Sequence, residues 1–173
     1  MIDNILEGNT KSCVDILGNT WNYDCMGCSI TGGNIIPPGG LVYDGTHCLL
    51  AADPEIPIPG FLIINTKRHI KSFRELNKEE INEITNVLWH AEKALDELNI
   101  SSELTIVQEE RSRHLHIWIY PNYPWMTEKF GKGVSYLRDI SEYARNNSTK
   151  ENVDNVLDVV NKVRNYFKEN YKD

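Results

Sequence analysis

The sequence predicts an α+β fold in which an antiparallel sheet packs against one long helix and is followed by a C-terminal helical extension. Short strand-like segments separated by turn residues occupy residues 41–66 and 103–120. Between them the hydrophobic period becomes that of an amphipathic helix, beginning at Asn77. The 173 residues contain no linker-like or low-complexity stretch, so we expect residues 1–173 to form a single domain.

The first strands are predicted from turn signals and apolar runs. Residues 41–44 and 47–52 flank the turn-forming pair Asp44 and Gly45, which predicts a hairpin. Residues 60–66 (GFLIINT) form an apolar run after two prolines, which predicts a further buried strand.

The helix is predicted by spacing and by its first turn. Asn77 and Glu80 form the sequence pattern of an N-cap and its reciprocal partner. The apolar positions recur three or four residues apart, at Ile81, Ile84, Leu88, Ala91, Leu95 and Leu98. His90 lies about half a turn from the stripe of Ile81, so we expect it to face solvent.

Strands and helices complete the chain. Residues 103–109 and 114–120 regain strand character across a short charged segment, so they are expected to pair as a hairpin. A short helix is then expected from Val134 to Ala144, and a second one capped by Ser148 with Glu151.

Charge and composition exclude several classes of function. The net charge of −7 argues against an extended nucleic-acid interface. No signal-peptide run and no stretch of 18 apolar residues occurs, so we expect a cytoplasmic protein without a membrane partner. Four cysteines in such a chain are better interpreted as thiols or metal ligands than as a disulfide framework.

The segment HLHIWIYP, residues 114–121, places two histidines on one strand face. Side chains alternate along a strand, so His114, His116 and Trp118 point to the side opposite the intervening apolar residues. The two histidines could simply lie on a solvated face of the sheet and have no function. A catalytic face is the alternative, and other parts of the chain favour it.

Cys25 and Cys28 have the CxxC spacing that lets two thiolates bind one tetrahedral zinc, with Gly27 easing a tight turn. His69, which follows a buried strand, and His114 are candidates to complete the site. A redox pair is the competing interpretation, but CxxC does not stand at the strand-to-helix junction of an evident βαβ unit.

These motifs resemble the histidine-triad (HIT) superfamily of nucleotide hydrolases and transferases. The closing motif of that family alternates three histidines with apolar residues, and HLHIWIYP matches two of the three. Residues 59–69 (PGFLIINTKRH) look like the strand and basic turn that precede its helix. The resemblance covers about residues 25–126. The extension at about 127–173 lies outside the common core and is assigned no catalytic role.

The resemblance implies roles for individual residues. It makes His116 the nucleophile that attacks the α-phosphorus and forms a covalent nucleotidyl-histidine. It also implies a structural zinc, Zn²⁺, held entirely by protein side chains. Its ligands would be Cys25, Cys28, His69 and His114. Asp53 falls where the family binds the ribose hydroxyls and Gln108 where an amide near the phosphates is common, although ordinary turn and strand-end roles stay open for both.

The sequence departs from the family pattern in two places. Only residues 109–113 separate Gln108 from His114, so a phosphate-binding stretch is shortened. Arg111, Ser112 and Arg113 are candidates to replace its donors, with a solvated hairpin tip as the alternative. Trp118 replaces the third histidine, and it could donate one hydrogen bond or simply cover the substrate.

We therefore expect a nucleotide-processing hydrolase or nucleotidyl transferase that acts on a nucleotide or dinucleoside polyphosphate, and a homodimer by family default. A nucleotide-binding module with little or no turnover is the alternative, favoured by the shortened loop and Trp118. A zinc-stabilised interaction domain is a third, which would require Asp53 and His116 to be accidental.

Overall fold

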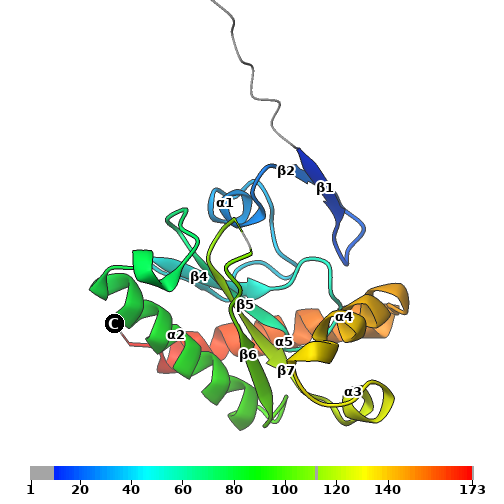
Figure 1. The fold of residues 1–173 in the computed structure, drawn as a ribbon. Coiled ribbons are helices and arrows are strands. Elements are labelled where there is room, and N and C mark those ends of the chain that lie inside the picture. Colours follow the sequence, from blue (N-terminus) through cyan, green and yellow to red (C-terminus); the bar gives the residue numbers. More distant parts are fainter. Residues whose placement is uncertain (1–9, 112, 173) are drawn as a thin grey trace, which may run out of the picture.

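The computed structural model describes residues 10–111 and 113–172. Its main sheet has five strands, all paired antiparallel, in the order β3-β4-β5-β7-β6 (Figure 1). A separate hairpin precedes it near the N-terminus. The hairpin strands are β1 (Lys11–Val14) and β2 (Thr20–Tyr23). The sheet strands are β3 (Tyr43–Asp44), β4 (Cys48–Ala52), β5 (Leu62–Thr66), β6 (Leu104–Val107) and β7 (His116–Pro121).

The helices fall in the α+β order that the sequence predicts. The α-helices are α1 (Met26–Thr31), α2 (Lys78–Glu97), α3 (Pro124–Lys129), α4 (Leu137–Asn146) and α5 (Lys150–Asn170). Two 3₁₀ turns join them, η1 (Phe73–Glu75) and η2 (Val134–Tyr136). No helix in the described parts of the chain is long and apolar enough to cross a membrane.

The principal core lies between the sheet and the pair α2 and α5. On β5 and β7 every second residue points into it, as the pleat requires. Ile64 and Ile117 are register partners there, and α5 contributes Val160 and Val163 beside them. The strand pairing also confirms the two predicted hairpins, because β3 pairs antiparallel with β4 and β6 pairs antiparallel with β7.

The predicted cap of α2 is confirmed, but its buried stripe is displaced from the predicted one. The Asn77 side chain accepts from the Glu80 amide, and the Glu80 carboxylate accepts from the Asn77 amide. Ile81 is exposed, whereas Glu80 and His90 are buried. The prediction that His90 faces solvent is therefore wrong, because α5 packs beside α2 and covers that side of the helix.

The other face of the sheet is covered by smaller elements. Ile30 and Ile35, in and after α1, pack on Leu49 of β4. The C-terminal extension packs through α3 and α4 against Tyr120, whose hydroxyl lies 3.0 Å from that of Ser141. A polar space remains between these two coverings, on the face that carries His116.

The C-terminal helices begin later than the sequence predicts. Val134 belongs to the short η2 turn and is 64% exposed, and the regular helix starts at Leu137. The cap of α5 is Thr149 with Asn152, one residue beyond the predicted pair. Ser148 and Thr149 both carry a hydroxyl that can cap the first turn of a helix, so the sequence alone does not decide between them.

Candidate metal centre and active-site cleft

The four predicted metal ligands come together, although they are far apart in the sequence. One ligand atom from each of Cys25, Cys28, His69 and His114 lies within 4.8 Å of the others. Cys28 Sγ is 3.0 Å from His69 Nδ1 and 3.4 Å from His114 Nδ1. Cys25 Sγ is 3.7 Å and 3.5 Å from the same two atoms.

These separations fit a tetrahedral zinc. Zn–S bonds near 2.3 Å and Zn–N bonds near 2.0–2.1 Å place sulfur and nitrogen about 3.5 Å apart along a tetrahedral edge. The two-sulfur, two-nitrogen donor set is one that zinc prefers in structural sites. A redox cysteine pair would not require two histidine nitrogens at this distance from both sulfurs, so the geometry favours the metal.

Helix α1 brings the two cysteines to His114. Cys25 is its N-cap and Cys28 lies in its first turn. Gly27 is buried, and a Cβ at that position would lie 2.5 Å from Cγ of the His114 imidazole. The expected role of Gly27 in a tight turn is therefore wrong. The glycine allows the imidazole to pack directly against the helix.

A backbone hydrogen bond orients the His114 ring. His114 is buried, and its Nε2 lies 2.6 Å from the carbonyl oxygen of Thr66. Because a carbonyl only accepts, Nε2 carries the proton and Nδ1 presents its lone pair toward the sulfurs. Burial lowers the pKa of His114, which keeps the ring neutral as a metal ligand must be.

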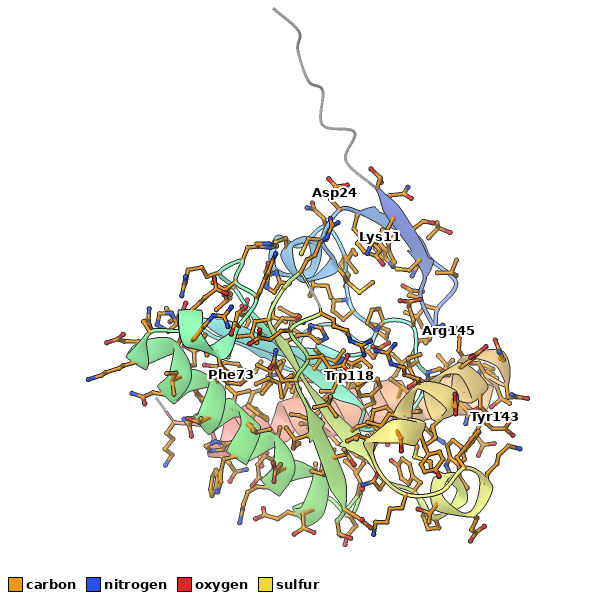
Figure 2. All side chains as sticks on the ribbon, viewed as in Figure 1. Lys11, Asp24, Phe73, Trp118, Tyr143 and Arg145 are labelled. Carbon is orange, nitrogen blue, oxygen red and sulfur yellow. The ribbon has the colours of Figure 1, made fainter. Side chains whose placement is uncertain are left out.

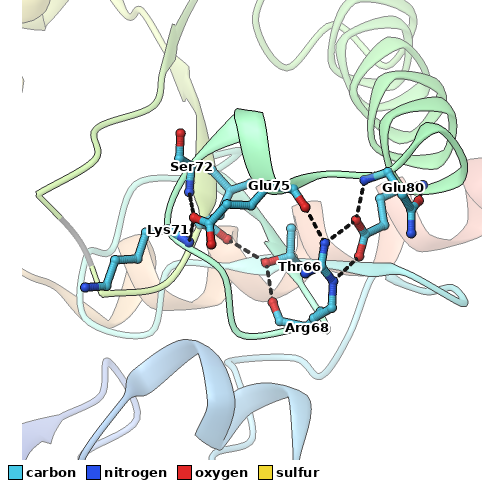
Figure 3. A network of polar contacts seen from close by, with 8 residues as sticks. Thr66, Arg68, Lys71, Ser72, Glu75 and Glu80 are labelled. Carbon is cyan, nitrogen blue, oxygen red and sulfur yellow. Dashed lines mark hydrogen bonds and ion pairs between the residues drawn. The ribbon is translucent and has the colours of Figure 1, made fainter.

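The turn that carries His69 is held by a polar network (Figure 3). Arg68 donates from Nε and Nη2 to the two carboxylate oxygens of the buried Glu80, both at 2.8 Å. These bonds lower the pKa of Glu80 to about 2. The Thr66 hydroxyl donates to the Arg68 carbonyl at 3.0 Å. The basic turn is thereby fixed between β5 and the start of α2, and His69 is the next residue along the chain.

His116 is oriented by its own strand. Its Nδ1 lies 3.0 Å from the carbonyl oxygen of His114, so Nδ1 donates and the ring lone pair is left on Nε2. His116 pairs in register with Asn65 of β5. The alternation predicted for residues 114–120 is confirmed, because Ile117 and Ile119 belong to the principal core whereas His116 and Trp118 line the opposite face, although β7 itself begins only at His116.

His116 lines a cleft of about 720 Å³. Three of the predicted substrate-binding residues, Asp53, Arg111 and Trp118, line the same cleft. The candidate Arg113 and the predicted metal ligands Cys25 and His114 also line it. Gln108 does not line it, and its buried Nε2 has no hydrogen-bond partner among the residues that the structure describes. The predicted residue Ser112 lies outside the described residues.

Asp53 is held at the end of β4 by an Asx turn. Its Oδ1 accepts from the amides of Glu55 at 2.8 Å and Ile56 at 2.9 Å. Burial raises the pKa of Asp53 to about 6, and the nearby Glu55 carboxylate acts in the same direction. The two backbone bonds and the Arg145 guanidinium oppose that rise.

Trp118 lies between this cleft and a second one of about 330 Å³. Its indole packs edge-on against Phe61, with ring centroids 5.3 Å apart, and its centroid is 6.3 Å from that of His116. His116, Arg111 and Arg138 also line both clefts. The position of the third histidine is thus occupied by a ring that shapes two adjoining spaces.

The C-terminal extension, to which the sequence assigns no catalytic role, forms one wall of the larger cleft. The lining residues of α4 are Asn146 and the set Arg138, Ser141, Glu142 and Arg145. The spacing of three, four and seven residues within that set puts its members on one helix face. Figure 2 shows Arg145 on α4 and Trp118 on the sheet, both of which line this cleft. The polar stripe is visible in the sequence, but nothing local indicates that it faces the histidines.

Asn65 was also missed by sequence reasoning. It is buried and lines the cleft beside its register partner His116. A polar residue inside the apolar run of residues 60–66 is the signal that could have identified it.

Another cleft, of about 890 Å³, lies elsewhere, between the loop before β5 and helices α3 to α5. Aromatic and amide side chains such as Trp125, Tyr143 and Asn155 line it. Among the described residues that form its walls there is no histidine or cysteine. The chemistry expected of the chain is therefore concentrated at the 720 Å³ cleft that His116 lines.

Comparison with known proteins gives likeness in structure only. No family model and no curated protein matches the sequence. Among solved structures, a histidine-triad nucleotide-binding protein from Sulfolobus tokodaii superposes with a TM-score of 0.57 at 18% identity, over 86% of this chain and 99% of the other. A zinc-bound histidine-triad protein from Mycobacterium smegmatis gives 0.54 at 15% identity, over 82% and 96%.

A third similar structure is the diadenosine triphosphate hydrolase of Plasmodium falciparum, solved with cyclomarin A. It has a TM-score of 0.54 at 14% identity, over 79% of this chain and 82% of that one. The likeness in all three spans most of both chains. Together with the five-stranded antiparallel sheet and the motif of residues 114–121, it shows that this chain has the fold of the histidine-triad proteins.

Proposed function

We propose that this protein is a nucleotide-processing hydrolase or nucleotidyl transferase that acts at an α-phosphate through a covalent nucleotidyl-His116 intermediate. The observation that carries the proposal is the orientation of His116, whose Nδ1 donates to the His114 carbonyl and whose ring lines the cleft. Similar folds that include a diadenosine triphosphate hydrolase support the same class of substrate.

The reaction follows from the tautomer of His116. The Nε2 lone pair attacks the α-phosphorus, and the bond from phosphorus to the leaving group breaks with its electrons on the leaving group. The Nδ1 proton stays on the ring, and the positive charge that develops there is stabilised by the His114 carbonyl. Water, or a hydroxyl of a second substrate, then attacks phosphorus and loses its proton to solvent, while the electrons of the N–P bond return to Nε2.

The remaining cleft residues bind and position the nucleotide. Asp53 lines the cleft and would accept hydrogen bonds from the ribose hydroxyls there, with its orientation fixed by the backbone amides of Glu55 and Ile56. Arg111 supplies a guanidinium for the phosphates, with which it can form paired hydrogen bonds. Trp118 provides an apolar wall and one indole N–H.

The cluster of Cys25, Cys28, His69 and His114 would hold a structural zinc. All four positions of a tetrahedral ion are then filled by protein, which leaves no site for a catalytic water. Such an ion links α1 and the basic turn to the segment entering β7, and so holds the backbone that orients His116.

A nucleotide-binding module with little turnover is the second candidate. Trp118 in place of a third histidine, and the absence of Gln108 from the cleft wall, both favour it. Each removes a group that would assist departure of the leaving group.

Incubation of the purified protein with radiolabelled dinucleoside polyphosphates and nucleoside phosphoramidates separates the candidates. Release of labelled mononucleotide that is lost in His116→Ala supports the enzyme. Saturable binding without release supports the binding module. Neither binding nor release would contradict both and leave a zinc-stabilised interaction domain.

A further inference from the structure

We propose that Arg138 of the C-terminal extension and Arg111 form an anion-binding subsite for the leaving group, in the smaller cleft beside His116. The subsite selects substrates whose leaving group carries its own phosphate over those that release a neutral amine. The inference rests on the proposed function for the identity of the reaction, but the anion site itself is testable without turnover.

The position of the smaller cleft indicates its role. It shares His116, Trp118, Arg111 and Arg138 with the larger cleft, whereas Asp53 lines only the larger one. A nucleotide with its ribose at Asp53 and its α-phosphorus at His116 therefore has the smaller cleft as an adjoining space for the group that departs.

The charges in the smaller cleft suit an anion. One carboxylate, that of Glu109, accepts from Arg111 at 2.8 and 2.9 Å and from Arg138 at 3.1 Å. Two guanidinium groups thus converge on one acidic group, which leaves a net positive charge. A phosphate oxygen can take the same place, since guanidinium binds carboxylate and phosphate through the same paired geometry.

The ion pairs are exposed enough to exchange. The side chains of Arg111, Arg138 and Glu109 are 69%, 65% and 47% exposed. Exposed ion pairs of this kind contribute little to folding stability, so an incoming phosphate can displace Glu109 at small cost. Glu109 therefore acts as an internal substitute for the anion when the site is empty of substrate.

The rest of the wall is apolar apart from Ser135 and suits the body of a nucleotide. Val107, Trp118, Val134 and Leu137 line it. Val134 and Leu137 come from η2 and the start of α4, so the extension supplies both the cation and part of the apolar wall. The indole of Trp118 offers a flat face on which a base can stack.

The first test compares two substrates that give the same intermediate. Diadenosine triphosphate releases a nucleoside diphosphate, whereas an adenosine phosphoramidate releases a neutral amine. Arg138→Gln should lower kcat/KM about 10- to 100-fold for the former, the effect expected for a lost charged hydrogen bond. It should change the latter less than about 3-fold. Arg74→Gln, which removes an exposed arginine that also faces a glutamate but lines none of these clefts, should change neither.

The second test measures binding of inorganic pyrophosphate by calorimetry. Arg138→Gln should weaken that binding about 10-fold. Arg138→Lys should weaken it by an intermediate factor, because lysine keeps the positive charge but lacks the paired N–H donors of the guanidinium. Glu109→Gln should tighten it severalfold, because the competing carboxylate charge is removed. Unchanged melting temperatures would show that the variants fold.

The outcomes distinguish the two proposals. Arg138-dependent pyrophosphate binding without nucleotide turnover would keep the anion site and contradict the proposed enzyme. Turnover that falls equally for both substrates in Arg138→Gln would contradict the leaving-group subsite and keep the enzyme. Weaker pyrophosphate binding in Glu109→Gln would also contradict the subsite, because it would make Glu109 a support for the arginines and not a competitor.

Discussion

The carbonyl oxygen of His114 lies 3.0 Å from Nδ1 of His116, while the imidazole of His114 turns to the two cysteines. One residue therefore contributes its side chain to the candidate metal centre and its backbone to the proposed nucleophile. The two sites are coupled through the short segment that enters β7, so loss of a bound metal should disturb His116 even though His116 is not one of the candidate ligands.

Zinc content is the first expected outcome. The purified protein should contain about one zinc per chain, and Cys28→Ser should lower both zinc content and melting temperature, because metal binding adds to the free energy of folding. Cys13→Ser is the matched control, since Cys13 is a buried thiol outside the cluster. Atomic absorption and a thermal melt are the measurements. Equal zinc in wild type and Cys28→Ser would refute the ligand set.

Gly27→Ala tests the packing of α1 on His114. The added methyl would meet the imidazole at 2.5 Å, so either the helix or the ring must move. We expect a loss of about 1–3 kcal/mol in the free energy of unfolding together with weaker zinc retention against a chelator. Ser29→Ala in the same helix should show neither effect. A stable, zinc-tight Gly27→Ala would mean that the ring does not pack on the helix as described.

The raised pKa of Asp53 predicts a pH dependence of stability. The folded protein keeps a proton on Asp53 up to about pH 6, whereas the ordinary value of 3.8 applies when it is unfolded. Between these two pKa values the folded state binds more protons than the unfolded state. The contribution of Asp53 to the free energy of unfolding therefore falls as the pH rises from about 4 to 6 and is constant above. Relative to Asp53→Asn, wild type should lose on the order of 2 kcal/mol across this window in urea unfolding. Parallel pH profiles would show that Asp53 is not perturbed.

Trp118→His restores the family's third histidine on the same strand face. The indole packs edge-on against Phe61 and lines both clefts, so the smaller ring should leave a gap and weaken substrate positioning. We expect lower turnover of diadenosine triphosphate and about 1 kcal/mol less stability, the worth of an aromatic pair. Turnover that stays the same or rises would instead make Trp118 a replaceable donor position.

Local patterns predict much of this fold. The cap of α2 at Asn77, the strand alternation at residues 114–120 and the hairpins depend on neighbouring residues, and all are confirmed. The N-terminal hairpin of β1 and β2 was not predicted, because its short strands carry no long apolar run. The buried side of α2 was misplaced at His90 because only the tertiary position of α5 decides it.

The candidate site likewise has a part that local sequence patterns predict and a part that only tertiary packing decides. The metal ligands could be named because CxxC and the histidines are themselves a chemical pattern, and the structure brings them together. The polar face of α4 could not be placed, since packing against Tyr120 turns it toward the cleft. Gln108 was expected near the phosphates, but it does not line the cleft. The homodimer and the cytoplasmic location stay predictions.

The most direct test of the central claim is to trap the intermediate. Wild type, His114→Ala and His116→Ala are mixed with α-³²P-labelled diadenosine triphosphate, quenched in alkali within milliseconds, and separated by denaturing electrophoresis. We predict an acid-labile, alkali-stable label on wild type that is absent from His116→Ala, whose zinc content and melting temperature remain those of wild type. His114→Ala should lose zinc first, with labelling reduced as its strand loosens. Label retained on His116→Ala, or zinc lost from His116→Ala and kept by His114→Ala, would contradict the account.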